Sequence, residues 1–152
     1  MAYYADLTPY SYWGTDSPSY SPSRDEPWPD LPVVNVGWLD AEHPFRAGVL
    51  PDGLLARLED LARVRVLQTR GCHYCELCIR DLGGSSYIRD LDAADRDQLM
   101  DELPCESAEL RIKGSEVVYS VPQLALHYIA AHGYLPPPEF CEAVTASTDE
   151  PS

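Results

Sequence analysis

The chain has 152 residues, enough for one domain with a buried core, and 45% of them are hydrophobic. Its 25 acidic and 11 basic residues give a formal charge of -14, so the average field of the surface repels a nucleic-acid backbone. No apolar run approaches the roughly 18 residues that span a bilayer. We therefore expect neither a nucleic-acid partner nor a membrane partner.

The N-terminal residues predict a cytoplasmic protein. The stretch MAYYADLTPYSYW has neither the basic start nor the uninterrupted apolar segment of a secretory signal. Thiols stay reduced in the cytoplasm, where clustered cysteines more often bind metal than form disulfides. The aromatic side chains of residues 3–13 are expected to pack on the domain, and the Ser- and Pro-rich residues 14–30 are expected to form an irregular connection.

Hydrophobic patterns predict one strand and two helices in the next part of the chain. Residues 31–39, LPVVNVGWL, are short and β-branched, as in a buried strand. Over residues 51–63 apolar side chains recur at spacings of three and four, which predicts an amphipathic helix with Pro51 at its first position. Residues 79–106 are weakly patterned and predict a Gly- and Ser-rich break, then one short helix closed by Pro104.

The last third of the chain predicts a hairpin and two helices. AELRIKGSEVVYS alternates apolar and polar residues around Lys113-Gly114-Ser115, which is typical of a β-hairpin. Ser120 is expected to cap a helix that has Pro122 in its first turn and stops at Gly133. PPEFCEAV predicts a last short helix, and residues 147–152 are expected to form a frayed tail.

The stretch GCHYCELC, residues 71–78, carries the strongest chemical signal. Cys75 and Cys78 have the C-x2-C spacing at which a tight turn brings two thiolates onto one tetrahedral Zn²⁺. His127 and His132 form H-x4-H, within the spacing of zinc-finger histidine pairs. On a regular helix, side chains that are five residues apart point in directions about 140° apart, so the two histidines would diverge. Both can face one ion only if the helix end tightens or unwinds; otherwise His73 or Cys72 must complete the set.

Other interpretations of the cysteines remain open. Free cysteines are often small buried hydrophobic residues, and a disulfide is an alternative. C-x2-C-x2-C also begins the bacterial ferredoxin run, but Leu82 stands where the fourth cysteine would be. A thioredoxin-like redox site would need a βαβ setting that the upstream chain does not predict. Glu76 could serve as the base of a zinc hydrolase, but the recognised catalytic motifs are absent, which favours a structural metal.

Four stretches resemble a family of uncharacterised bacterial proteins, a domain of unknown function. They are YYADLTPY, NVGWLD with HPF, TRGCHYCELC and VVYSVPQLALHYIAAHGYLPPPEF, which together cover roughly residues 1–144. The resemblance implies a loop of the form G-aromatic-H-x-C-x2-C, which maps onto His73, Cys75 and Cys78. It also implies a helix motif H-Y-x3-H-G-Y from His127 to Tyr134. The usually apolar position before the first histidine is Cys72 here, a departure that argues against Cys72 as a ligand.

The sequence therefore predicts a small single α+β domain over residues 1–146, with a short antiparallel sheet or hairpin, three or four helices and a zinc-stapled loop. The metal candidates are Cys75, Cys78, His127, His132 and His73, five residues for four places. We expect the zinc to be structural, in a binding or regulatory module with a protein partner. A zinc-dependent hydrolase with an open coordination position near Glu76 is the alternative.

Overall fold

A three-stranded sheet lies at the centre of the computed structural model, which describes residues 3–9, 31–63, 73–106 and 108–146. Across the sheet the strands are β1 (Val33–Asn35), β5 (Val118–Pro122) and β4 (Glu109–Lys113). β4 and β5 form the predicted antiparallel hairpin. β1 pairs in parallel with β5, so the sheet is mixed rather than antiparallel. Parallel pairing requires a long connection between the strands, and the residues between β1 and β5 supply one.

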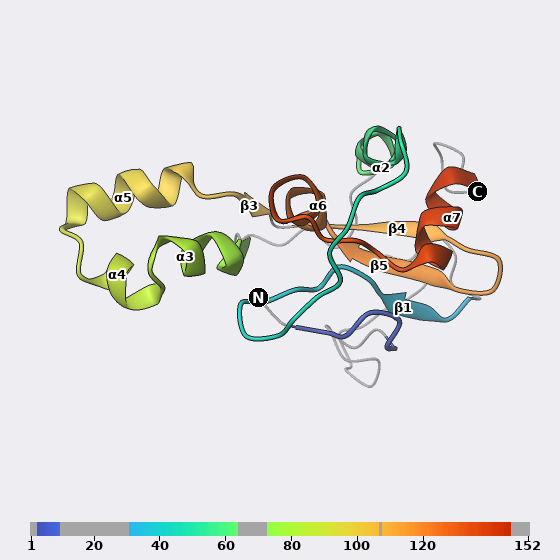
Figure 1. The fold of residues 1–152 in the computed structure, drawn as a ribbon, viewed down its shortest axis with the longest axis horizontal. Coiled ribbons are helices and arrows are strands. Elements are labelled where there is room, and N and C mark those ends of the chain that lie inside the picture. The colour runs from blue at the N-terminus through green and yellow to red at the C-terminus, as the bar shows by residue number, and fades with distance from the viewer. Residues whose placement is uncertain (1–2, 10–30, 64–72, 107, 147–152) are drawn as a thin grey trace.

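The described residues form six helices, more than the three or four that we expected. They are α2 (Leu54–Leu61), α3 (Glu76–Leu82), α4 (Ser85–Arg89), α5 (Ala93–Glu102), α6 (Ala125–His132) and α7 (Pro138–Ala146). The α+β class is confirmed. In Figure 1, α2, α6 and α7 lie together on one side of the sheet, and α3, α4 and α5 extend away from it.

The main core lies between the sheet and the helices α2, α6 and α7. Leu110 and Ile112 project from the same face of β4, as predicted, and both are buried against these helices. Leu58, Tyr128 and Phe140 fill the space from the helix side. Burial of large apolar side chains of this kind stabilises the fold by roughly 1.5–3 kcal/mol for each residue. The hairpin and α6 are thus fixed to one core.

The opposite face of the hairpin carries buried polar groups. Arg111 Nη1 lies 2.7 Å from Glu109 Oε1 and 3.3 Å from Ser120 Oγ, and all three residues are buried. The indole Nε1 of Trp38 donates to the Ser120 carbonyl at 3.0 Å. Ser120 therefore lies inside β5, and the prediction that it caps a helix is wrong. The β pairing of Ser120 with Arg111 and Asn35 outweighs its local capping preference.

Residues 73–106 leave the core and return to it, and we call this segment the excursion. It begins with β2 (His73–Tyr74) and ends with β3 (Cys105–Glu106), which pair with each other in an antiparallel ladder. Between them α3, α4 and α5 form the extension on the left of Figure 1. α5 has no buried residue. The excursion therefore contributes little apolar area of its own, and its position depends on its base.

Arg96 of α5 ties the outer helices of the excursion together. Its guanidinium donates to three carbonyl oxygens at or just after the end of α4, those of Ile88, Arg89 and Leu91, at 2.9–3.3 Å. Carbonyls at the end of a short helix lack part of their internal bonding, and the guanidinium adds a donor to each of these three, although the Ile88 carbonyl also accepts the Leu91 N–H at 3.2 Å. The interaction joins α4 to α5, and it does not connect either helix to the core.

The N-terminal residues pack against the domain, as predicted for the part that is described. Leu7 donates its amide N–H to the Asn35 carbonyl at 2.7 Å, and the Asn35 N–H donates to the Thr8 carbonyl at 2.8 Å. Asp6 accepts the Gly37 N–H at 3.0 Å and the Tyr134 hydroxyl at 2.8 Å. The expectations for residues 14–30 and 147–152 lie outside the described residues. None of the helices in the described ranges has the length and apolar character needed to span a bilayer.

Candidate metal centre

Cys75 and Cys78 project from the first turn of α3. Cys75 is the N-cap of this helix and its sulfur accepts the Cys78 N–H at 3.4 Å, while its own N–H donates to the Pro104 carbonyl at 3.1 Å. Leu77 between them is fully buried and fixes the turn to the core. The cysteine segment was predicted as a loop. It is instead a helix start, because a sulfur replaces the usual oxygen as the capping acceptor.

His127 and His132 project from α6, whose last turn is wider than a regular turn. The N–H groups of Gly133 and Tyr134 both donate to the Tyr128 carbonyl, and the first of these bonds spans five residues, as in a π-turn. Gly133 permits this with a left-handed φ of 70°. The two Nε2 atoms lie 3.2 Å apart, so the histidine side chains face one another despite the 140° divergence expected of a regular helix. The predicted condition, an unwound end at Gly133, is what the structure shows.

Four donor atoms converge where α3 meets α6. The sulfurs of Cys75 and Cys78 and a ring nitrogen of each histidine all lie within 4.8 Å of one another. Cys78 Sγ is 3.2 Å from His127 Nε2 and 3.4 Å from His132 Nε2, and Cys75 Sγ is 3.4 Å from His132 Nε2. The two Nε2 atoms are 3.2 Å apart. We call these four residues the metal group.

These distances fit a tetrahedron around one small ion. Zinc bonds of about 2.3 Å to sulfur and about 2.0–2.1 Å to nitrogen imply tetrahedral edges of about 3.5 Å between sulfur and nitrogen and about 3.3 Å between two nitrogens. Hydrogen bonds alone explain the group less well, because the one Nε2 of His132 cannot donate to two sulfurs and a nitrogen at once. The Cys2His2 group is thus positioned to hold a metal ion.

The electrostatics of the metal group favour neutral side chains when no cation is bound. Cys75 is fully buried, and this desolvation raises the pKa of its thiol to about 12. Burial, and then the charge of His132, lower the pKa of His127, so its imidazole is neutral at pH 7. A neutral imidazole can coordinate metal directly, whereas the buried thiol needs a nearby cation to lose its proton.

Asp81 is an outer partner of the metal group that the sequence did not reveal. Its Oδ2 lies 3.9 Å from His132 Nδ1, the ring nitrogen that faces away from the sulfurs. This separation is longer than a hydrogen bond, and a carboxylate that moved within hydrogen-bond distance would orient a metal-binding imidazole and fix its tautomer. Asp81 stands three residues after Cys78, one helical turn along α3, but acidic residues are so frequent in the chain that its position carried no signal.

The structure brings four of the five predicted candidates together. The fifth, His73, has its backbone in β2, and its side chain and the whole of Cys72 lie outside the described part of the molecule. Glu76 is not a member of the metal group. Cys75 and Cys78 are free thiols, so no disulfide joins the predicted clamp. His43 hydrogen-bonds to Asp40 near the surface, 2.8 Å away.

Comparison with known proteins assigns the chain to a family without assigning an activity. No curated protein and no solved structure matches it. A family model described as a domain of unknown function, DUF7919, matches residues 2–145. This range includes the sheet, the excursion and all four residues of the metal group. The chain therefore belongs to the DUF7919 family of domains of unknown function.

Proposed function

We propose that Cys75, Cys78, His127 and His132 bind one structural Zn²⁺ that fastens the excursion to α6. The observation that carries this proposal is the convergence of four donor atoms within 4.8 Å, at nearest separations of 3.2–3.4 Å. Two thiolates and two imidazoles are the ligand set that suits zinc among the common metals. The two ligands on α3 and the two on α6 come from segments that are distant in the chain.

An iron–sulfur cluster fits this geometry less well than a single ion. A cluster with two cysteines and two histidines places the histidines on one iron and the cysteines on the other. The two pairs would then be separated from each other. Here Cys78 Sγ lies as close to His127 Nε2 as the two imidazole nitrogens lie to each other, at 3.2 Å. Because a cysteine sulfur lies as close to a histidine nitrogen as the two histidine nitrogens lie to each other, the distances support one metal ion bound by all four residues.

A structural role agrees with a full set of four protein ligands. A catalytic zinc keeps three protein ligands and one position open for water. The alternative, a zinc hydrolase, requires Glu76 as a base beside such an open position. Glu76 lies outside the metal group, which favours the structural role. The metal group also lies at the base of the excursion, where the two-residue strands β2 and β3 and the bond from Cys75 to Pro104 supply limited pairing. The metal would reinforce this base.

We further propose that the module uses the excursion to contact a protein partner. Leu82 and Tyr87, two of its side chains, are 41% and 48% exposed although they are large and apolar. In the described part of the N-terminal arm Leu7 is exposed to a similar degree, 39%, but its neighbours Tyr3 and Tyr4 are half-buried. Capture of a companion protein by the wild type, and its loss in Tyr87→Ala but not in Val49→Ala, would support this role. Equal capture by both variants would contradict it.

Metal analysis of the purified protein tests the zinc proposal. We expect about one zinc per chain and, on removal by a chelator, a fall in melting temperature, because ligands that converge only in the fold turn metal-binding energy into folding energy. Replacement by Co²⁺ should give the visible absorption of a tetrahedral site with thiolate ligands. Loss of zinc with an unchanged melting temperature would contradict the structural role. Cobalt spectra of a five- or six-coordinate ion would favour the hydrolase.

A further inference from the structure

The outer part of the excursion leaves two large apolar side chains in contact with solvent. Leu82, the last residue of α3, is 41% exposed, and Tyr87 on α4 is 48% exposed. Tyr87 packs over Gly83, since its Cβ lies 3.2 Å from the position that a β-carbon on Gly83 would take. In Figure 1, α4 lies at the end of the excursion that is farthest from the sheet. We call Leu82 and Tyr87, which stand at neighbouring points of this surface, the apolar pair.

The segment that carries the apolar pair is strongly acidic. Residues 76–102 contain eight acidic and three basic side chains. Asp81 directly precedes Leu82, and Asp90 follows Tyr87 by three residues, which is about one helical turn. Both carboxylates are exposed. Negative charge therefore lies next to each member of the apolar pair.

The three arginines of this segment are already engaged within it. Arg80 pairs with Asp81 at 3.2 Å. Arg89 donates to the Ser86 hydroxyl at 3.2 Å, and Arg96 donates to carbonyl oxygens at the end of α4. By contrast, several exposed carboxylates have no bonding partner among the described residues: Asp90, Asp95, Asp97, Asp101 and Glu102. This end of the molecule therefore carries an excess of uncompensated negative charge.

The charge selects among the possible occupants of this surface. A second copy of the chain also has a net charge of -14, so two such surfaces repel each other. A nucleic acid or an anionic membrane is repelled for the same reason. An uncharged apolar segment would cover the apolar pair, but it would remove water from the nearby carboxylates without replacing it. A segment that combines cations with a large apolar residue satisfies both parts of the surface.

We infer that the apolar pair and the carboxylates beside it dock a basic, amphipathic segment of a partner protein. Its large apolar residues would pack on Leu82 and Tyr87, and its Lys or Arg side chains would lie against Asp90 and Asp97. Opposite charges of this kind speed association and select the partner. The inference rests on the proposal that the excursion contacts a protein partner, and it adds the chemistry of that partner.

Amide NMR of the purified full chain with two capped synthetic peptides tests the inference. The peptide KKLKKLKK combines lysines with leucines at helical spacing, and QQLQQLQQ keeps the leucines without the charge. We expect saturable shifts in α4 and α5 with the basic peptide, and binding of the neutral peptide that is about tenfold weaker. Raising the salt concentration from about 50 mM to about 500 mM should weaken binding of the basic peptide about fivefold, because salt screens exposed charges.

Two single variants test the apolar part of the surface. Tyr87→Ala should weaken binding of KKLKKLKK about fivefold, as expected for an aromatic anchor. Val49→Ala removes a side chain that is even more exposed, 93%, but lies outside the excursion, and it should leave the affinity unchanged. Both positions are exposed, so both variants are expected to fold. Equal affinities of the two variants would contradict the role of Tyr87.

Two double variants test the charge. Asp90→Asn/Asp97→Asn should weaken binding of KKLKKLKK about threefold to tenfold. Glu139→Gln/Glu142→Gln removes the same charge from exposed positions on α7 and should leave the affinity unchanged. Equal weakening by both double variants would mean that only the net charge of the chain attracts the peptide, which overturns the inference.

The neutral peptide separates this inference from the proposed function. If QQLQQLQQ bound α4 and α5 as tightly as KKLKKLKK, the partner would not need to be basic, while the excursion would remain a docking surface. If neither peptide shifted the amides of α4 and α5, the inference would be overturned. Capture of a companion protein through Tyr87 would then decide the proposed function by itself.

Discussion

Cys75 combines two structural roles in one side chain. Its sulfur accepts the Cys78 N–H as the N-cap of α3, and the same atom lies 3.4 Å from His132 Nε2 in the metal group. N–H groups at a helix start favour negative charge, so the cap stabilises the thiolate that a metal requires. Opposing this, burial raises the pKa of the thiol to about 12. A bound cation is what would shift the balance to the thiolate.

Replacement of Cys78 should remove the metal and destabilise the fold. Cys78→Ser leaves three ligands, and we expect loss of bound zinc together with a decrease of at least about 3 kcal/mol in the free energy of unfolding, because metal loss is among the few causes of large single-substitution effects. Cys141→Ser is the matched control, because Cys141 is also a half-buried free cysteine on a helix. It should keep its zinc. Metal analysis and urea denaturation of both variants measure the difference, and equal zinc content would contradict the assignment.

Asp6 should make stability depend on pH in an identifiable window. Burial raises the pKa of its carboxyl above the ordinary 3.8, although the Gly37 N–H and the Tyr134 hydroxyl partly oppose this. The folded chain therefore holds this proton more tightly than the unfolded chain does. The resulting stabilisation is complete below pH 3.8 and is lost as the pH rises through the folded-state pKa.

The variant Asp6→Asn removes this titration. Its free energy of unfolding relative to wild type should rise as the pH increases from 3.8 through the folded-state pKa and then become constant. Denaturation curves at several pH values between about 3.5 and 7 measure this difference. Asp52→Asn, an exposed change elsewhere, should give a flatter difference. A constant or falling difference for Asp6→Asn would show that its pKa is not raised in the folded chain.

The end of α6 connects backbone conformation to the metal group. Gly133 has a φ of 70°, and no heavy atom lies within 4 Å of the position that a β-carbon would take, so alanine would bring strain without a clash. Gly133→Ala should cost about 1–2 kcal/mol of stability and also weaken zinc binding, because the strain falls on the turn that orients His132. Gly133→Asn should cost less, since asparagine tolerates this conformation.

Gly53 provides the control for that prediction. It has a φ of 80° and open space around it, at the start of α2 rather than beside a ligand. Gly53→Ala should therefore lower the free energy of unfolding by a similar amount while zinc affinity, measured by competition with a chelator, stays unchanged. If both alanine variants changed the zinc affinity equally, the backbone conformation of Gly133 would have no specific influence on zinc binding.

Elements that depend on local pattern could be predicted from the sequence. The leucine spacing indicated α2, although the helix begins at Leu54 rather than at Pro51, and alternation indicated the β4–β5 hairpin. Gly133 marked the end of α6, and the divergence expected of its two histidines correctly required an irregular turn there. C-x2-C and H-x4-H identified the four residues that the structure brings together. Whether they bind metal remains a prediction.

Elements that depend on distant partners could not be predicted. The parallel pairing of β1 with β5 joins Val33 to Val118, a contact that no local pattern indicates. α3 has a cysteine as its N-cap, which sequence rules for capping do not include. The bond from Gln123 Nε2 to the Ala62 carbonyl joins two elements that are distant in the chain, and no local pattern indicates it. For the β1–β5 pairing and the Gln123 bond the information lies in tertiary contacts, whereas the cap of α3 is local and falls outside the usual residue preferences.

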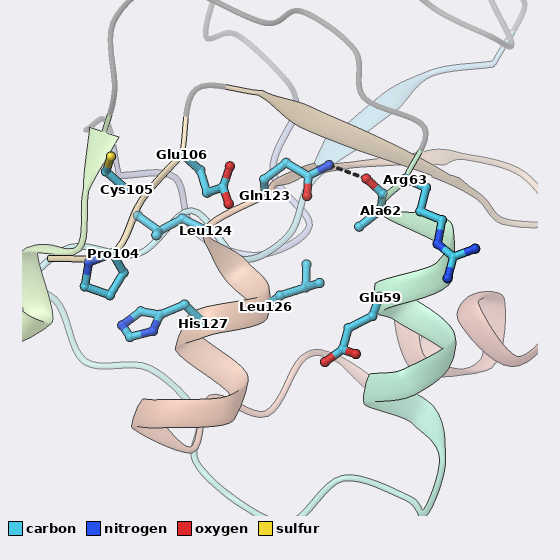
Figure 2. A pocket seen from close by; sticks show the side chains of 10 residues that line it. All are labelled: Glu59, Ala62, Arg63, Pro104, Cys105, Glu106, Gln123, Leu124, Leu126 and His127. Atoms are coloured by element: carbon cyan, nitrogen blue, oxygen red, sulfur yellow. Dashed lines mark hydrogen bonds between the residues drawn. The ribbon is translucent and has the colours of Figure 1, made fainter. Parts of the chain in front are cut away.

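The fold as a whole divides into a core that is stable through apolar burial and an excursion that depends on its base. The core cluster joins the sheet to α2, α6 and α7. The excursion adds Cys75 and Leu77 to that cluster, and its outermost helix α5 buries nothing. The metal group joins these two parts, since α3 belongs to the excursion and α6 to the core. A cavity of about 540 Å³ also lies at this junction, between α2, α6 and β3 (Figure 2).

Zinc removal should therefore loosen the excursion before it affects the core. Local stability differs between parts of a protein, and amide hydrogen exchange reports it residue by residue. After chelation we expect faster exchange in α3, α4 and α5, because the base then loses the metal and keeps the short β2–β3 pairing, the bond from Cys75 to Pro104 and the buried Leu77. Amides of β4 and β5 should keep most of their protection, since apolar burial among the sheet, α2, α6 and α7 holds their core together. Uniform loss of protection would instead mean that the metal supports one cooperative fold, and unchanged exchange in α3 would contradict a structural metal.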